Sequence, residues 1–489
     1  MIDKRLKVFK NQYILTDKKI NQPSLSNSYK IGSYNLVTSQ EIQVFISNNN
    51  IITLIGYSFH CYNSKKEQEI VNHLSTLENE ELLSEIDNLC GHFVIISNRI
   101  KLKIYTDACS SLKVFYAKSN KYTFIGSDPK TLCQFHNFTF DNDKERNTFY
   151  QSKYFLNNST KVGHHTRYKN MYQLVSNHCL SVYNLKSERI FPRNIRKEFS
   201  MIDVSEKLIP IFKNILNQIE KRHTIYTSIT AGYDSRLLMS ATKKLSKKIK
   251  YYTFKLPNKA ENIIDYILPN KICSDLNLDY SLVKIDYLKK EKIKEIKSIY
   301  DLPKLRPFQQ YRNIFPKNKK PNILLVGFVS EVAKNYLEKV KVRNGKDVVR
   351  AVHSPDNKYL ESYYQNWLDR NQHQIKKFGY EILDFIHWEQ DITNFAGQNT
   401  YYAHHYVNLF SIFNSREILK IMLSVNPKLR DGKNTILFKY LIEKMWPELL
   451  NYPFNPTKKE KIILFMKKIK IYSIYKSLQI YFYNHGEVK

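Results

Sequence analysis

The chain has 489 residues, of which 42% are hydrophobic and 13% aromatic, and its 77 Lys and Arg against 45 Asp and Glu give a formal net charge of +32. This length predicts two or three domains with sizeable cores, and the composition excludes a disordered chain. So positive a field attracts nucleic acid, anionic membranes, or phosphorylated and carboxylate substrates. The lysines are spread along the whole chain, however, which favours compositional drift over one basic binding arm.

The six cysteines show no close pairing and no C-x-x-C spacing. This argues against a zinc site of the common spacing and against a disulfide framework, so we expect reduced thiols. The N-terminal stretch lacks the apolar segment of a signal peptide, and no apolar run approaches the roughly 18 residues of a membrane span. We therefore predict a soluble, cytoplasmic protein.

The first part of the chain is predicted to be mostly β-structure. Short runs rich in Ile, Val, Tyr, Phe and Thr, separated by polar or Gly-containing breaks, predict strands at 49–59, 91–97, 101–107 and 121–128. Apolar residues at helical spacing predict one helix over 64–89. A proline and clustered charge over 189–200 predict a domain boundary, so we assign 1–195 to a first domain and 196–489 to a second.

Strands and helices alternate after the boundary, which predicts β-α-β units and a parallel sheet. We expect helices at 204–221, 235–245 and 261–277, and strands at 224–230, 248–255, 280–286 and 322–327. Ligands of such sheets bind beyond the carboxyl ends of the strands, where Gly232 and Gly327 fall. From about residue 355 onward the pattern is largely helical.

The stretch ITAGYDSR, residues 229–236, has the features of a phosphate-binding turn. The small residues Thr230, Ala231 and Gly232 let a ligand approach the backbone, and Asp234 and Ser235 are suited to cap the following helix. A helix N-terminus favours phosphate, and a carboxylate with substrate phosphates favours Mg²⁺. No GK[ST] follows, so the turn is not a Walker A loop.

This stretch resembles the pyrophosphate loop SGGxDS of the asparagine synthetase superfamily, the ATP pyrophosphatases. Thr230 and Ala231 stand in place of the Ser and the first Gly, whereas Gly232, Asp234 and Ser235 match. The resemblance implies that the loop binds the pyrophosphate of ATP and that Asp234 binds Mg²⁺. It further implies an enzyme that adenylates a carboxylate, after which an amine displaces AMP to form an amide.

Two more stretches carry the same resemblance. YYTFK, residues 251–255, is similar to the family's strand that borders adenine, which implies a role for Phe254. LLVGFVSEVAKNYL, residues 324–337, is similar to the second acidic motif GDGADE, with Gly327 at the first Gly and Glu331 at the metal-binding Asp. Phe328 and Val332 depart from the motif. A divergent subgroup with AGYDSR and a GNxGE-type motif is more similar still, and its members are associated with polysaccharide and other secondary biosynthesis.

Several cations and carboxylates near these motifs admit two interpretations. Arg236 and Lys255 are suited either to pairing with triphosphate or to a solvated surface, and Asp265 either to the family's acidic position or to a solvated helix face. Tyr233 lies inside the loop. The family's catalytic KxxLR motif aligns near TILFKYLIEKMWP, which leaves Lys433 and Lys439 as candidates for stabilising charge at the adenylate, or as solvated helix residues.

The first domain resembles a class II glutamine amidotransferase, which implies an αββα sandwich. GHFVIISNRIKLKIYTDACSSLKVFYAKSNKYTFIGSDPKTL, residues 91–132, is similar to its central sheet, with Gly91, Phe93 and Asp107 at recurrent positions. The family's nucleophile is a Cys at position 2, but this chain has Ile2 and no Cys before Cys61. We predict that glutamine hydrolysis is lost and that the domain is a remnant that packs on the second domain or shapes its acceptor site.

The leading hypothesis is therefore an ATP- and Mg²⁺-dependent ligase that joins a small-molecule or sugar carboxylate to an amine supplied as free ammonia or on a second substrate. An inactive scaffold is the second hypothesis, because the loop, the acidic motif and the nucleophile all depart from the family. RNA modification through adenylation is the third, motivated by the net charge, although no RNA-binding module supports it. The basic, apolar C-terminal stretch 458–486 suits either a helix packed on the domain or peripheral contact with an anionic membrane.

Overall fold

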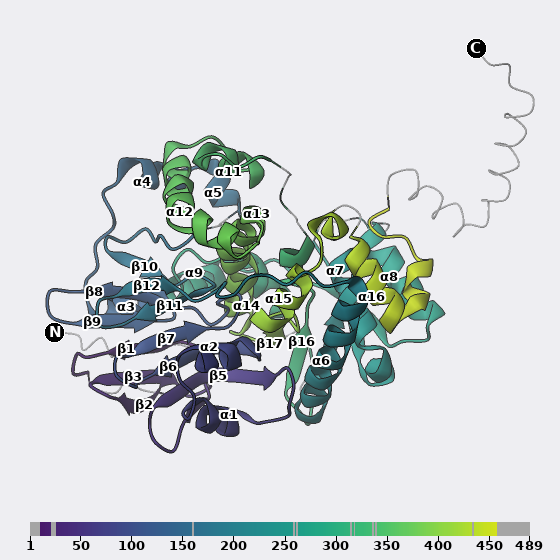
Figure 1. The fold of residues 1–489 in the computed structure, drawn as a ribbon, viewed down its shortest axis with the longest axis horizontal. Coiled ribbons are helices and arrows are strands. Elements are labelled where there is room, and N and C mark those ends of the chain that lie inside the picture. The colour runs from purple at the N-terminus through teal and green to yellow at the C-terminus, as the bar shows by residue number, and fades with distance from the viewer. Residues whose placement is uncertain are drawn as a thin grey trace, which may run out of the picture.

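The computed structural model of the chain describes residues 10–20, 26–158, 161–257, 260, 263–312, 315–316, 318–334, 337, 340–432 and 435–456. Within these residues, the N-terminal part contains two six-stranded antiparallel sheets, and the C-terminal part contains a five-stranded parallel sheet with helices around it (Figure 1). The predicted fold class is confirmed in both parts.

The two antiparallel sheets pack face to face. One has the strand order β10-β8-β9-β1-β3-β2 and the other the order β12-β11-β7-β6-β5-β4. Apolar side chains from both sheets, among them Leu15 and Leu36 of one and Val94 and Ile96 of the other, form a buried core between them. The strands are β1 (Tyr13–Thr16), β2 (Ser26–Ile31), β3 (Tyr34–Ser39), β4 (Val44–Ile46), β5 (Ile52–His60), β6 (Leu89–Ser97), β7 (Lys103–Thr106), β8 (Phe115–Lys118), β9 (Thr123–Gly126), β10 (Met171–Gln173), β11 (His178–Ser181) and β12 (Lys186–Arg189).

Helices cover the outer faces of both sheets. α1 (Glu67–Leu74) and α2 (Asn79–Asp87) pack on the β5–β6 face, and α3 (Pro129–Phe135) packs on β1 and β9. The single helix predicted over 64–89 is therefore wrong, because the chain leaves the helix between α1 and α2. There the Thr76 hydroxyl donates to the carbonyl of His73 at 2.8 Å, a local bond that competes with helix continuation.

Two further helices of this part lie away from its sheets. α4 (Lys144–Gln151) and α5 (Lys153–Asn158) lie beside α11 (Gly345–Ala351) and α12 (Lys358–Lys377), which belong to the C-terminal part (Figure 1). The hydroxyls of Tyr154 and Ser354 lie 3.2 Å apart at this contact. An N-terminal segment thus reaches over the C-terminal part.

The parallel sheet has the order β15-β14-β13-β16-β17. The chain passes from β13 (Thr224–Ser228) to β14 (Lys250–Lys255) and β15 (Tyr280–Lys284), and then returns to the other side of β13 with β16 (Asn322–Leu325). The strand order therefore reverses between β13 and β16, and ligands of open α/β sheets bind beyond the carboxyl ends of the strands at such a point. The edge strand β17 (Asn408–Phe410) lies in the region whose pattern was predicted to be largely helical, and pairing with β16 holds this short segment extended.

Long and short helices surround this sheet. Apolar residues of α6, α7 and α16 join one buried core with β13 and β16. The elements not yet given bounds are α6 (Met201–Arg222), α7 (Tyr233–Ala241), η1 (Lys243–Lys248), α8 (Ile264–Asp275), α9 (Lys290–Ile299), α10 (Leu305–Tyr311), η2 (Ser330–Lys334), α13 (Ile382–Ile386), the π-helical η3 (His387–Gly397), α14 (Gln398–Ala403), α15 (Arg416–Leu423), η4 (Pro427–Arg430), α16 (Ile436–Met445) and η5 (Pro447–Asn451).

Candidate functional site

The turn between β13 and α7 is held by its own hydroxyl groups. The backbone N–H of Thr230 donates to Ser235 Oγ at 3.0 Å, and the N–H of Gly232 donates to Thr230 Oγ1 at 3.2 Å. The two hydroxyl oxygens lie 2.9 Å apart. Thr230 therefore supports the turn through its hydroxyl.

Gly232 occupies the N-cap position of α7, and none of the described side chains caps this helix start. The capping roles predicted for Asp234 and Ser235 are wrong, because these residues lie inside the first turn and their side chains bond elsewhere. Among the described residues, a Cβ added at Gly232 would lie within 4 Å of Thr230 Oγ1, at 3.4 Å, and of Asn455 Oδ1, at 3.6 Å, and of no other atom. These residues thus leave open the space beside Gly232.

Asp234 points toward the segment that follows β16. Its Oδ1 accepts a hydrogen bond from Ser330 Oγ at 2.7 Å, and its Oδ2 forms an ion pair with Lys334 Nζ at 2.6 Å. Neither partner was predicted from the sequence, although Ser330 and Lys334 flank Glu331 within the quoted acidic motif. A cation of the chain thus neutralises the predicted metal ligand.

Glu331 lies beside this pair. Its Oε2 is buried and has no hydrogen-bond partner among the described residues. Burial, and next the charge of Asp234, raise the pKa of the Glu331 carboxyl to about 7, while Lys334 and His387 lower it. A buried carboxylate oxygen without a partner, close to a second carboxylate, has the donor chemistry that Mg²⁺ prefers.

The described residues contain no group of three or more His, Cys, Asp and Glu side chains able to hold a metal ion. Mg²⁺ in nucleotide sites is often bound by one or two carboxylates together with substrate phosphates. The pair Asp234 and Glu331 fits that kind of site, in which the nucleotide supplies the remaining oxygens.

Gly327 brings the end of β16 onto the start of α7. A Cβ at this position would lie 2.7 Å from the carbonyl carbon of Asp234 and 2.9 Å from the backbone nitrogen of Ser235. Only glycine allows this approach of two backbones. Because β16 ends against the start of α7, the carboxyls of Glu331 and Asp234 lie close enough for the charge of one to raise the pKa of the other.

A cavity of about 840 Å³ opens at this switch point. Six of the predicted site residues line it, namely Thr230, Asp234, Ser235, Phe254, Gly327 and Glu331. The remaining lining residues are Phe155, Leu156, Ser228, Tyr252, Lys297, Leu302, Pro303, Lys304, Leu305, Arg306, Gln310, Tyr311, Val326, Phe328, Phe395 and Asn399. Residues far apart in the sequence therefore meet at one hollow.

Aromatic rings form the wall of the cavity on the β14 side. The Phe254 ring lies 5.0 Å from that of Tyr252 and 5.4 Å from that of Tyr311, both edge-on. Tyr311 ends α10, a helix that lines the cavity and was not predicted from the sequence. This wall offers flat apolar surface of the kind on which a purine ring stacks.

Three cations line the cavity, and none was predicted. Lys297 and Arg306 are exposed, whereas Lys304 is half-buried and its Nζ lies 3.4 Å from the carbonyl oxygen of Asn394. Burial, and next the charge of Lys161, lower the pKa of Lys304 to about 8. These residues lie in helices and loops without a motif, so the sequence carried no signal for them.

Four predicted loop residues do not line the cavity. Arg236 is fully buried, and its guanidinium donates to the carbonyls of Leu449, Tyr452 and Pro453. This geometry does not support the predicted contact of Arg236 with triphosphate. The rings of Tyr233 and Phe454 stack at 4.4 Å. Ala231 and Gly232 contribute backbone to the loop rather than wall to the cavity.

The backbone of Ala231 is anchored on both sides. Its N–H donates to Asp265 Oδ1 at 3.1 Å, and its carbonyl accepts from the N–H of Asn455 at 3.0 Å. Asp265 therefore stabilises the loop by accepting a backbone hydrogen bond, a role that neither interpretation of the sequence had specified. Lys439 Nζ lies 6.0 Å from the centre of the Tyr233 ring, and Lys433 lies outside the described residues.

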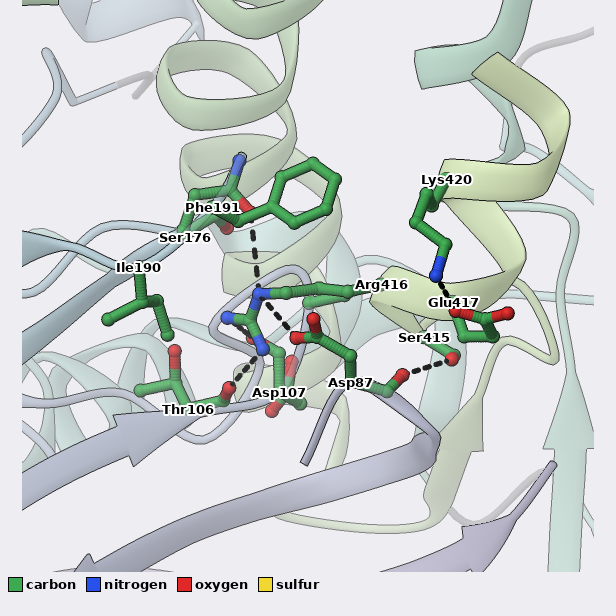
Figure 2. A network of polar contacts seen from close by, with 12 residues as sticks. Asp87, Thr106, Asp107, Ser176, Ile190, Phe191, Ser415, Arg416, Glu417 and Lys420 are labelled. Atoms are coloured by element: carbon green, nitrogen blue, oxygen red, sulfur yellow. Dashed lines mark hydrogen bonds and ion pairs between the residues drawn. The ribbon is translucent and has the colours of Figure 1, made fainter. Parts of the chain in front are cut away.

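A buried polar network joins the N-terminal part to the C-terminal part. The Arg416 guanidinium, 1% exposed, donates to the carbonyls of Thr106 and Asp107 at 3.0 and 3.3 Å, and its Nε lies 4.0 Å from Asp87 Oδ1 (Figure 2). Asn414 Nδ2 donates to Asp107 Oδ1 at 3.0 Å. Asp107, predicted as a recurrent position, thus has a structural role at the interface.

All six cysteines are described, and all are free thiols. Burial raises the pKa of every one of them, to about 11 for Cys133 and Cys179 and to about 12 for Cys61 and Cys273. Burial also raises the pKa of Cys90 and of Cys109 well above the usual value of a thiol. At neutral pH the chain therefore holds its thiols protonated, which is the unreactive form.

No family model and no curated protein matches the chain. Among solved structures, glutamine phosphoribosylpyrophosphate amidotransferase from B. subtilis, complexed with ADP and GMP, matches at 8% identity and a TM-score of 0.23 over 67% of this chain and 71% of its own. NMN synthetase from Francisella tularensis matches at 15% identity and a TM-score of 0.22 over 42% of this chain and 94% of its own.

A third structure, described as the allosteric regulatory enzyme of purine biosynthesis, matches at 8% identity and a TM-score of 0.24 over 71% of this chain and 72% of its own. Scores this low carry no argument about the site or its chemistry. The function proposed below therefore rests on the cavity and the residues that line it. No helix among the described residues combines the length and the apolar character that crossing a membrane requires.

Proposed function

We propose that this protein is an ATP- and Mg²⁺-dependent ligase that activates a carboxylate and joins it to an amine. The observation that supports this is the meeting of the turn residues Thr230, Asp234 and Ser235 with Phe254 and Glu331 in one cavity at the switch point of a parallel sheet. The family resemblance of the two motifs supplies the reaction type.

In the proposed reaction a carboxylate oxygen of the acceptor attacks the α-phosphorus of ATP, and pyrophosphate leaves. The amine nitrogen then attacks the acyl carbon, loses a proton and displaces AMP, so that one amide bond forms. The open space before Gly232 and the N-terminus of α7 would receive the pyrophosphate, and the Phe254 wall would border the adenine. Mg²⁺ held by Asp234 and Glu331 would offset the charge of the phosphates.

The amine would come from free ammonia or from a second substrate. Burial keeps the six described thiols protonated, so none of them is suited to act as the nucleophile of glutamine hydrolysis. We propose that the N-terminal part is retained as a packing partner, consistent with the buried Arg416 network.

The ion pair between Asp234 and Lys334 specifically favours the alternative, an inactive scaffold. In that case the ammonium of Lys334 permanently occupies the place of a metal. In the ligase, by contrast, Lys334 releases Asp234 and turns toward the phosphates when nucleotide and Mg²⁺ bind.

Calorimetric titration with ATP, in Mg²⁺ and in EDTA, separates the two functions. We expect Mg²⁺-dependent binding by the native chain, and a loss of at least about tenfold in affinity for Asp234→Ala, which corresponds to about 1.4 kcal/mol. Asp356→Ala, at an exposed aspartate in the loop before α12, is the matched control and should bind as the native chain does. Absence of ATP binding by the native chain, with or without candidate carboxylates, would contradict the ligase and favour the scaffold.

A further inference from the structure

The cavity at the switch point has two sides. β14 and β16 flank β13 on opposite sides, so residues that follow them border opposite ends of the cavity. The β14 side carries the rings of Phe254, Tyr252 and Tyr311 described above. The β16 side carries Phe328, directly after Gly327, and the two sides are separated by the turn that holds Asp234.

Beside Phe328 the cavity is lined by apolar side chains that the described residues leave partly exposed. The Phe328 and Phe395 rings meet edge-on at 5.8 Å, and Phe395 is 43% exposed. Leu156, on α5 of the N-terminal part, also lines the cavity and is 66% exposed. Leu302 and Pro303 line the same cavity. Large apolar side chains exposed inside one hollow favour an apolar occupant.

One cation stands in this apolar wall. Lys304 Nζ lies 5.1 Å from the centre of the Phe395 ring, and within the described part of the chain no carboxylate forms an ion pair with it. The carbonyl of Asn394 is an uncharged partner, and Asp391, whose charge raises the pKa of Lys304, contacts His387 Nδ1 at 3.0 Å and forms no ion pair with Lys304. A half-buried cation of this kind gains most from a carboxylate delivered by a ligand.

From these contacts we propose that the acceptor is a carboxylic acid with an apolar, aryl-sized body, whose carboxylate pairs with Lys304 while its body packs on Phe328, Phe395 and Leu156. That this acid is the acceptor rests on the proposed ligase function, whereas binding of the acid itself does not require nucleotide. A second charged group packed against Phe328 and Phe395 would lose hydration to apolar rings, so we expect an amino acid or dicarboxylic acid to bind more weakly.

In this arrangement the N-terminal part contributes to binding of the acceptor. α5 contributes Leu156 to the acceptor wall although the sheets of that part lie elsewhere (Figure 1). A remnant of this kind would determine which acid is accepted without performing any chemistry.

The test is calorimetric binding of 4-phenylbutyrate and of aspartate without nucleotide. The native chain should bind 4-phenylbutyrate at least about tenfold more tightly than aspartate. Leu156→Asp should lose about tenfold or more in affinity for 4-phenylbutyrate, whereas Ile100→Asp, the same change at a 97% exposed aliphatic residue, should not. Lys304→Met should weaken the binding of 4-phenylbutyrate but leave the binding of the uncharged 4-phenylbutanol unchanged.

Tighter binding of aspartate, or Leu156→Asp binding as the Ile100→Asp control does, would overturn the proposal. The Mg²⁺-ATP titration of the same proteins distinguishes this failure from failure of the ligase. If 4-phenylbutyrate binds as expected while ATP does not bind, the preference for an apolar acid stands and the ligase is wrong. If ATP binds while 4-phenylbutyrate does not, the ligase stands and this inference is wrong.

Discussion

At the scale of single residues, burial makes the carboxyl of Glu331 in the candidate site hard to ionise. Its carboxyl is buried beside Asp234, and its pKa is raised from 4.5 to about 7. A group that is harder to ionise in the folded than in the unfolded chain keeps its proton when folded. The free energy of unfolding therefore falls as the pH rises from about 4.5 to 7, and the loss is complete above that window.

We predict that Glu331→Gln removes this pH dependence. At about 1.4 kcal/mol per pKa unit, the native chain should lose roughly 3 kcal/mol of stability relative to the variant between pH 4.5 and pH 7.5. Urea denaturation at both pH values measures the difference. Glu443→Gln, at an exposed position of α16, serves as control and should show no such change. A constant difference between the native chain and Glu331→Gln would show that Glu331 ionises normally.

At the scale of elements, the β13–α7 turn and the end of β16 make different demands on their glycines. Gly327 has the backbone of Asp234 within 2.7 Å of the place of a Cβ, whereas Gly232 has nothing closer than 3.4 Å. The first glycine is required by packing inside the chain. Beside the second, the described residues leave room for a Cβ.

We predict opposite outcomes for the two alanine variants. Gly327→Ala should destabilise the chain by about 1–3 kcal/mol, because rigid backbone must move. Gly232→Ala should change the free energy of unfolding by less than about 1 kcal/mol, the range of an exchange at an N-cap, yet weaken the binding of Mg²⁺-ATP. Thermal unfolding and calorimetry on both variants provide the measurement. If Gly232→Ala binds Mg²⁺-ATP as the native chain does, phosphate does not occupy that space.

At the scale of the whole molecule, buried polar groups fasten the two parts together. Arg416 of α15 spans the interface, while Lys420, one turn further along the same helix, pairs with Glu417 near the surface (Figure 2). Glu389 likewise binds Arg189 Nη2 of the N-terminal part at 2.8 Å. Breaking a buried charged network leaves its partners unsatisfied, which costs far more than losing a surface pair.

We predict that Arg416→Met costs about 3–5 kcal/mol and that both parts unfold in one transition in the native chain. Lys420→Met, on the same helix but 49% exposed at its side chain, should cost less than about 1 kcal/mol. Denaturation followed by far-ultraviolet circular dichroism and by tryptophan fluorescence tests this. Two separate transitions in the native chain would show that the parts are not coupled through this network.

The sequence by itself determined the alternation of strands and helices around residues 224–327 and the two strand ends that carry Gly232 and Gly327. Such features depend on local patterns: apolar runs form buried strands, and small residues form the turns between strand and helix. The fold class followed for the same reason, and the motif at residues 324–337 placed Glu331 at the correct strand end. The division at residue 195 stays a prediction.

Only the tertiary structure decided what the charged side chains do. Arg236 turns to carbonyls more than 200 positions away, Lys334 pairs with Asp234 across 100 positions, and Leu156 reaches a cavity built from the other part of the chain. The sequence pattern around each of these residues is compatible with solvent exposure. Which partner a long side chain finds depends on how distant segments pack, and packing is a property of the whole molecule.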